Sequence, residues 1–475
     1  MGVSGNVLAQ PAPAPAPEPA PPAAEPPPAP APTDQPTTPA NPANPPAPGP
    51  PPVASQPPTV APPAPPATSF PTMTGPALKL SDLFTIRFGV FTQLWANFTQ
   101  DAFKQTNGDS GAFSKNVYLR RARFFVGGNI TDRMTYFMLW ETANLGSPTA
   151  NADGSTNKNQ LTFAFNDAYI DFKINPAFSV QAGLMLIPFT RNILQSTSTY
   201  WALDVGGVSA TYIAATATST LRDTGVAVKI NAADNHFELR GMVSEGVRLG
   251  DLTPSAAMPP TGVARNPGKN DPRFSTFAQY NFLDPDTGYV FNGQYFGRKK
   301  IAGIAAGADY QSLASNPYFA TSATAFAAIP INGVDPKNGG DEIGGQIEYL
   351  HFHGGGVVLN PNTMAPVGPP QPGLPVAAGG LGKQDALLAE AGYYNKAAKF
   401  SVFGKFEGRF YKEDVQKPSN VRIYGVGVKY FLAEQIANLT LMYSLTQFPD
   451  LPSPGLADIR NSVNALQLQL QVGYF

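Results

Sequence analysis

The chain ends on Asn464-Ala465-Leu466-Gln467-Leu468-Gln469-Leu470-Gln471-Val472-Gly473-Tyr474-Phe475, in which apolar side chains alternate with amides. Alternate side chains of a pleated strand point to opposite faces, so the leucines share one face with Val472 and Tyr474. The glutamines share the other face. Residues 84–98 repeat the pattern, with Phe, Ile, Val and Leu on one face and Thr, Arg and Gln on the other. Strands that are apolar on one face and polar on the other are typical of a membrane β-barrel.

Composition agrees with a large barrel and excludes several other classes of protein. The 475 residues include 14% charged residues, 11% aromatic residues and 45 glycines, and the mean hydropathy is −0.14. No run of 18 apolar residues occurs, which excludes a helical membrane protein. The net charge of −1 gives no indication of a nucleic-acid partner. The chain has no cysteine, so disulfides and thiolate chemistry are excluded.

Residues 1–80 form a leader of different composition, which carries most of the 51 prolines in runs of Pro and Ala. The leader has no basic residue before Lys79 and no apolar periodicity, so we expect a disordered spacer in extended polyproline II conformation. The alternative is a tether that spans part of the periplasm or touches peptidoglycan. Val7-Leu8-Ala9 resembles the end of a secretory signal peptide. We expect either a true start upstream of Met1, which we favour, or another export route.

From Leu83 onward, alternating segments are separated by turns rich in Gly, Pro, Asn and Asp, and we assign residues 81–475 to one barrel domain. Tight turns alternate with long loops at 144–162, 187–221, 245–271, 353–385 and 448–460, as they do at the two ends of an outer-membrane barrel. The sequence therefore predicts an all-β fold, a transmembrane antiparallel barrel of about sixteen strands. We place these strands near 83–98, 117–129, 132–143, 163–174, 177–186, 222–231, 235–244, 272–282, 299–310, 319–328, 341–352, 386–395, 397–411, 420–432, 436–447 and 461–475.

Alternation also predicts which side chains face the lumen, because the lipid face must be apolar. The pattern directs Tyr118 and Arg120 toward the lipid and sends a set of cationic residues inward. These candidate pore-lining and anion-guiding residues are Arg87, Arg121, Arg123, Lys173, Arg191, Lys229, Arg240, Lys405, Arg409 and Lys429. Inward acids partly neutralise them, namely Glu141, Asp171, Glu238, Glu348 and Glu407. The predicted lining is mixed and mildly basic.

An ordered set of segments carries a more specific indication. The segments are Leu119-Arg120-Arg121-Ala122-Arg123, Asp167-Ala168-Tyr169-Ile170, Val180-Gln181-Ala182-Gly183 with Pro188-Phe189, Arg222-Asp223-Thr224-Gly225-Val226, and the terminal Leu-Gln repeat. In this order they resemble landmarks of the phosphate-selective porin O/P family, over roughly residues 81–475. The resemblance implies a sixteen-stranded trimeric outer-membrane porin with its third loop folded into the channel. It also implies an arginine ladder that guides anions and lysines at the constriction.

The sequence departs from this family pattern at two places. The expected constriction loop, 187–221, has Arg191 at its start, one acid, Asp204, and no later Lys or Arg. Its other candidate residues are Tyr200 and Trp201. Stripping phosphate of water requires several fixed cationic donors, so narrow phosphate selectivity is not expected. At the carboxy-terminus, Phe475 falls on the opposite face from Tyr474, so either a bulge restores its phase or Tyr474 takes the aromatic role in the assembly signal.

The predicted function is passive diffusion of small solutes and ions through the outer membrane, with mild anion preference. The alternatives are a phosphate- or polyphosphate-selective porin and a structural envelope protein that uses its leader as a tether. We expect outer-membrane lipid, small anions or solutes, the barrel-assembly machinery and a homotrimer as partners, with the leader in the periplasm. We expect no enzyme, cofactor or metal: the three histidines cannot supply a catalytic triad, and His351 and His353 lack further ligands.

Overall fold

A computed structural model gives the arrangement of the barrel. It describes residues 77–81, 83–101, 113–150, 156–159, 163–206, 221–246, 251–254, 263–266, 271–312, 317–353, 383–412, 417, 420–450 and 460–474. Within these residues there is no helix long and apolar enough to cross a membrane. The leader up to residue 76, and with it the expected signal remnant, lies outside the described residues.

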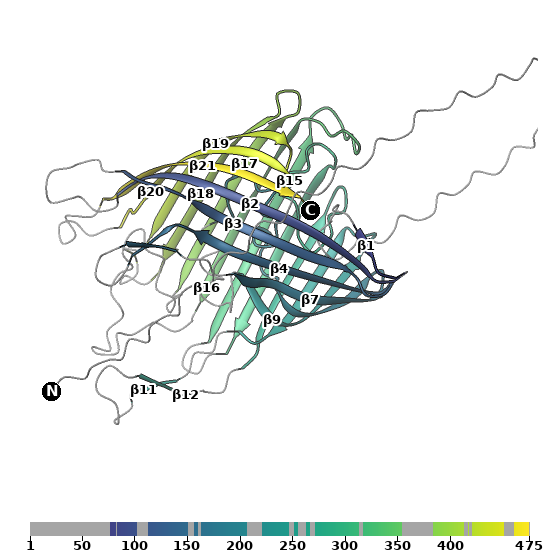
Figure 1. The fold of residues 1–475 in the computed structure, drawn as a ribbon. Coiled ribbons are helices and arrows are strands. Elements are labelled where there is room, and N and C mark those ends of the chain that lie inside the picture. Colours follow the sequence, from purple (N-terminus) through teal and green to yellow (C-terminus); the bar gives the residue numbers. More distant parts are fainter. Residues whose placement is uncertain are drawn as a thin grey trace, which may run out of the picture. The chain divides into compact units, whose positions relative to one another are not determined.

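One antiparallel sheet of seventeen strands forms the structure (Figure 1). The short strand β1 (Ala77–Lys79) pairs only with β2, while the other sixteen pair in chain order and close where β2 meets β21. The predicted barrel of sixteen strands is therefore confirmed. These strands are β2 (Thr85–Gln100), β3 (Phe113–Asn129), β4 (Met134–Leu145), β7 (Ala164–Asn175), β8 (Phe178–Leu186), β9 (Arg222–Ala232), β10 (Phe237–Ser244), β13 (Arg273–Asn281), β14 (Ile301–Gln311), β15 (Tyr318–Pro330), β16 (Glu342–His353), β17 (Gln384–Asn395), β18 (Phe400–Tyr411), β19 (Val421–Ala433), β20 (Ala437–Gln447) and β21 (Ser462–Tyr474).

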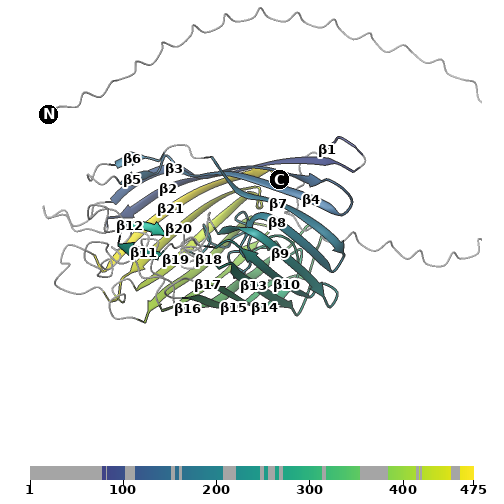
Figure 2. The ribbon, with the colours of Figure 1, turned by 90° about the horizontal axis from the view of Figure 1, so that it is seen from below.

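The two ends of the barrel differ in the length of their connections. Tight turns join β3 to β4, β7 to β8, β9 to β10, β17 to β18 and β19 to β20 at one end, which we call the short-turn end. Long connections join the strands at the other end, which we call the long-loop end. Two small hairpins belong to those long connections (Figure 2), formed by β5 (Pro148–Ala150) with β6 (Thr156–Lys158) and β11 (Asp251–Pro254) with β12 (Val263–Asn266). The sequence pattern predicted none of these four short strands.

The terminal strand shows the two faces that its alternating sequence predicts. Leu466, Leu468, Leu470, Val472 and Tyr474 are 37–52% exposed on the outer face, whereas Gln469 and Gln471 are only 1% exposed. On the inner face the two amides meet strand β2 directly. The indole Nε1 of Trp95 donates to Gln469 at 2.6 Å, and Gln93 donates to Gln471 at 3.0 Å. These side-chain hydrogen bonds reinforce the backbone ladder where the barrel closes.

A β-bulge between β2 and β3 corrects the predicted facing of two residues. Gln93 pairs with Arg121 and Leu94 pairs with Leu119, so an extra residue, Arg120, stands between them on β3. Because a bulge shifts the alternation by one residue, Tyr118 turns inward against Trp95, with ring centroids 6.1 Å apart. The lipid-facing prediction for Tyr118 and Arg120 was wrong, since periodicity cannot locate an inserted residue.

Strand β1 continues the wall beyond the end of β21. Tyr474 pairs with Val90 of β2, and Ala77 pairs with Arg87 a few residues further along the same edge. The aromatic side chain of Tyr474 lies on the outer face and is 52% exposed. Phe475, the other residue of the expected assembly signal, lies outside the described residues.

Candidate functional site

The connection between β8 and β9 enters the barrel. Its described part, residues 187–206, is here called the inner loop. Ile187, Phe189 and Leu194 have no exposed surface, and Trp201 is 1% exposed. A loop at the long-loop end can bury such side chains only by packing against the inner wall. The inward position that the family resemblance implied for this loop agrees with the structure over 187–206, while residues 207–220 lie outside the described part.

Arg191 fixes the first half of the inner loop. Its guanidinium donates to Gln279 of β13 at 2.8 Å, to Asp286 at 2.9 Å and to the Tyr295 hydroxyl at 3.1 Å. The same group stacks over the ring of Phe326, 3.7 Å from its centroid. Arg191 is only 1% exposed and forms an ion pair with Asp286, so it holds this half of the loop in place.

Trp201 fixes the second half against the adjoining strands β16 and β17. A Cβ built on Gly392 would lie 2.4 Å from its ring, and one built on Gly344 would lie 2.8 Å away. Only glycine at these wall positions leaves room for the indole. Beside it, the Nζ of Lys429 on β19 donates to the backbone oxygen of Tyr200 at 2.6 Å. These contacts attach the inner loop to the wall from β13 to β19.

Asp204 ties the far end of the inner loop to the bulge in β3. Arg120 and Arg121 each bring a guanidinium nitrogen to 2.7 Å from its carboxylate. Burial opposes ionisation of Asp204, but the two arginines overcome it and hold the pKa of this carboxyl well below its usual range. The bulge, by turning Arg120 inward, supplies half of this contact.

A second segment enters the lumen from the short-turn end. Residues 282–300 between β13 and β14, here called the inner turn, bury Tyr289, Phe291, Tyr295 and Phe296 to 6% exposure or less. The alternating pattern did not predict this inward segment. The run Tyr289-Val290-Phe291-Asn292-Gly293-Gln294-Tyr295-Phe296 carried a usable signal, because a water-exposed turn does not need four aromatic side chains.

The inner loop and the inner turn meet backbone to backbone. The amide of Ser196 donates to the Phe291 oxygen at 2.7 Å, and the Phe291 amide donates to the Leu194 oxygen at 2.8 Å. Most of their apolar side chains form one cluster with aromatic residues of the inner wall, among them Phe137, Phe277 and Phe352, and Trp201 and Phe296 belong to a second cluster. The lumen thus contains an apolar core, whereas the alternation of the strands predicted a polar lumen.

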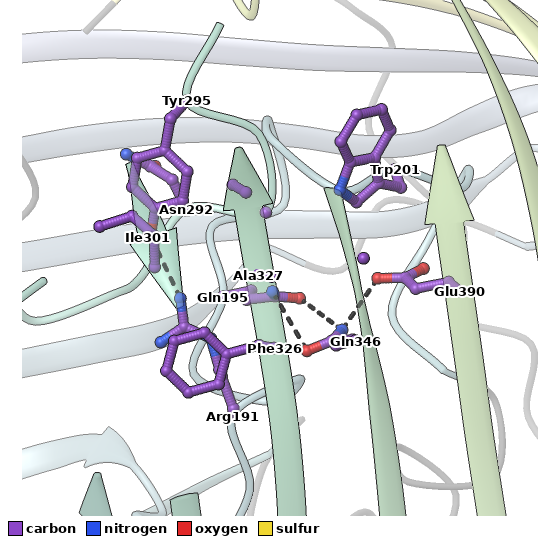
Figure 3. Close-up of a pocket in the computed structure, with 13 residues that line it drawn as sticks. Arg191, Gln195, Trp201, Asn292, Tyr295, Ile301, Phe326, Ala327, Gln346 and Glu390 are labelled. Atoms are coloured by element: carbon purple, nitrogen blue, oxygen red, sulfur yellow. Dashed lines mark hydrogen bonds between the residues drawn. The ribbon is translucent and has the colours of Figure 1, made fainter. Parts of the chain in front are cut away.

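A small cavity marks the junction of the two segments (Figure 3). Its volume of about 10 Å³ is room for roughly one water molecule. Gln346 of β16 donates to Gln195 at 3.0 Å and to Glu390 at 2.8 Å across its floor. Trp201 lines the same space, and among the described residues its indole nitrogen has no hydrogen-bond partner.

The predicted pore-lining cations lie on the inner face, but most of them are paired. Arg123 contacts Glu141 at 2.6 Å, Lys229 and Arg240 share Glu238 at 3.0 and 2.6 Å, and Lys405 pairs with Glu407. Further pairs that the sequence did not predict join Arg222 to Asp167 and Arg273 to Asp309. Arg240 and Lys405 pair with an acid two residues away on their own strand, which alternation alone places on the same face. The partners of Arg123, Lys229, Arg222 and Arg273 lie on other strands, so the register of the sheet brings these pairs together.

The other predicted cations have different surroundings. Lys173 lines an open cavity of about 310 Å³ at the short-turn end, together with Arg133 and Lys229. Arg409 lies over the ring of Tyr411 at 6.0 Å, and Arg87 lies where β1, β2 and β3 meet. These positions are geometric findings, and a role in guiding anions stays a prediction.

The histidine pair lies away from the lumen. His351 and His353 share the outward face of β16, where His351 Nδ1 is 2.8 Å from Asp385 Oδ1. The described residues contain no group of three or more His, Cys, Asp or Glu side chains that could hold a metal ion.

Comparison with known proteins gives one family and a set of solved barrels. Residues 88–299 match the model of the family described as phosphate-selective porin O and P, which confirms the resemblance over that part of the chain. No curated protein matches the chain. Among solved structures, the chain is similar to an anion-selective porin from Comamonas acidovorans, with 10% identity over 82% of this chain and 99% of that chain and a TM-score of 0.48. It is also similar to OmpT of Vibrio cholerae, with 11% identity over 84% of this chain and 100% of that chain and a TM-score of 0.45. A third similar structure is the outer membrane channel DcaP of Acinetobacter baumannii, with 12% identity over 82% of this chain and 97% of that chain and a TM-score of 0.44.

Proposed function

Residues 88–299 match the model of the phosphate-selective porin O and P family. On this basis we propose that the chain is an outer-membrane porin that conducts small ions with a weak preference for anions. The observation that carries the proposal is the pairing of lumen charges. Arg121, Arg123 and Arg240 each lie within 3.6 Å of a carboxylate oxygen. A paired guanidinium attracts a passing anion less than an isolated one does, because its field is largely that of a dipole.

The inner loop supports weak rather than narrow selectivity. Arg191 is its one cation between residues 187 and 206, and this guanidinium is committed to Gln279, Asp286 and Tyr295. Dehydrated phosphate needs several donors to replace its water shell. Few such donors are available along the inner loop, so chloride and phosphate are expected to pass as hydrated ions.

A phosphate-selective porin is the second candidate, and one cluster favours it. Arg120, Arg121 and Arg123 on β3 face two carboxylates, Asp204 and Glu141, which leaves an excess of one positive charge. The family description points the same way. Phosphate selectivity would require this excess charge to bind phosphate tightly.

Planar-bilayer recording separates the two candidates. Reversal potential in a KCl gradient is expected to give a modest preference for chloride, and phosphate is expected to reduce the chloride current only at high concentration. Exchanging Arg121 and Arg123 for Ala is expected to shift the reversal potential toward cations. Lys115→Ala is the matched control, because this exposed lysine lies at the long-loop end of β3. Block of the chloride current by submillimolar phosphate would establish the second candidate instead.

Orientation, assembly and the leader complete the proposal. We propose that the short-turn end faces the periplasm, as short turns do in outer-membrane barrels, and that the chain is inserted by the barrel-assembly machinery and forms a homotrimer. The leader is proposed to lie in the periplasm as a spacer. A chain that begins near Ser81 behind a signal peptide is expected to assemble normally, and its failure to do so would favour a structural tether.

A further inference from the structure

The inner turn contacts the inner wall of the barrel at both of its halves. At its start, the backbone oxygen of Gly288 accepts bonds from Lys229 and Arg240, both at 2.7 Å. The Tyr289 hydroxyl donates to Asp167 of β7 at 2.5 Å. These partners face inward from β7, β9 and β10, so the first half of the inner turn is attached to one side of the lumen.

The second half of the inner turn is attached to the other side. Glu342, the first residue of β16, accepts bonds from the backbone amides of Tyr295 at 3.1 Å and Gly297 at 2.9 Å. Phe296 packs edge-on between Tyr394 of β17 and Phe431 of β19, with ring centroids 5.1 and 5.4 Å apart. The inner turn therefore crosses the barrel from β7 to β19.

We propose that the inner turn is a second constriction element, that it determines the narrowest section jointly with the inner loop, and that Glu342 positions it. This inference rests on the proposed function as a porin. The inner loop does not depend on the inner turn for all of its anchoring, because Trp201 and Asp204 are held by the barrel wall. Removing the inner turn is therefore expected to widen the lumen without releasing the inner loop.

The inner turn also reduces the positive charge that the lumen presents. It carries Asp286, the acidic partner of Arg191, and its carbonyl oxygens cover Lys229 and Arg240. Without it these three cations would face water with fewer acceptors. A shortened inner turn should therefore raise anion preference as well as conductance, a combination that simple widening does not predict.

The first test shortens the inner turn in the full chain. Residues 285–299 are replaced by Asn-Gly, a two-residue hairpin turn flanked by Asp284 and Lys300, whose backbones already pair. The expected result is at least a twofold rise in single-channel conductance with a reversal potential shifted toward chloride. Glu342→Gln, which keeps the shape of the side chain but removes its charge, is expected to give a smaller change in the same direction. Folding of each variant is checked by its gel mobility with and without boiling.

The second test leaves the inner turn intact. The natural chain has no cysteine, so a single thiol can be placed at Asn292, an exposed residue of the inner turn beside the cavity (Figure 3). Modification of Asn292→Cys by a charged methanethiosulfonate is expected to cut the conductance by at least half. Asp234→Cys, on the exposed turn between β9 and β10, is the control and should keep its conductance after modification.

The outcomes separate this inference from the proposed function. Folded variants with wild-type conductance, or a modified Asn292→Cys channel with unchanged current, would overturn the role of the inner turn while leaving the porin intact. If the wild-type protein itself gives no channels in the bilayer, the proposed function fails first.

Discussion

Asp204→Asn is the substitution that most directly tests how charge pairing controls ion preference. It removes one negative charge from the inner loop but keeps the shape of the side chain. Arg120 and Arg121, which each lie 2.7 Å from the carboxylate, would lose their shared partner. The arginine cluster of β3 would then present more positive charge to the lumen, so chloride should be favoured and potassium disfavoured.

The size of the effect follows from Coulomb's law. An ion that passes at about 7 Å in water, with a dielectric constant of about 80, gains or loses about 0.6 kcal/mol from one unit charge. Screening at about 0.1 M salt removes roughly half of this. Chloride and potassium change by about 0.3 kcal/mol each in opposite directions, and the difference corresponds to about a threefold rise in the permeability ratio.

Reversal potentials in a KCl gradient measure this ratio directly. Asp234→Asn removes the same charge on an exposed turn at the short-turn end and should leave the ratio unchanged. The inner loop should also be held less firmly, because loss of one partner of a buried pair costs about 3–5 kcal/mol and the cost for these side chains, at 7–21% exposure, should lie at or below the lower end. A folded Asp204→Asn channel with the wild-type permeability ratio would refute the claim that this carboxylate offsets the arginines.

Three further predictions follow from the same contacts. Gly392→Ala should destabilise the folded barrel by about 1–3 kcal/mol, because the new methyl group collides with Trp201. Gly404→Ala is the control, since a methyl group there meets no atom within 4 Å and should have little effect. The urea midpoints of unfolding of both variants measure this difference. The folded pKa of Asp204 is lowered, so its ion pairs stabilise the protein above the unfolded value of about 3.9 and are lost only as pH falls through the lowered pKa. The difference in reversal potential between wild type and Asp204→Asn should therefore stay nearly constant from pH 7 to about 3.5. A carboxyl with the unfolded pKa of about 3.9 would lose more than half of this difference by then, and that result would contradict the pairing. Phosphate should block the chloride current no more strongly than sulfate, which a titration of both anions can check.

The fold was largely predictable because lipid imposes its requirement on each strand separately. A segment such as Leu466–Tyr474 shows its outer face by alternation alone, whatever its neighbours are. The strand count, the order of short turns and long loops, and the inward direction of Lys405 and Arg409 follow from the same local rule. The rule fails at Arg120, because an inserted residue changes the phase without changing the composition of the strand.

The sequence by itself thus determined the membrane barrel, its approximate strands and the sign of the charges on its inner face. Only the tertiary structure decided how the charges of different strands and loops are paired and what occupies the lumen. Arg191 meets Asp286, and Trp201 meets Gly392, across long stretches of chain in the closed barrel. Such contacts depend on barrel closure and strand register, which no single segment encodes, so the site is a property of the assembled wall.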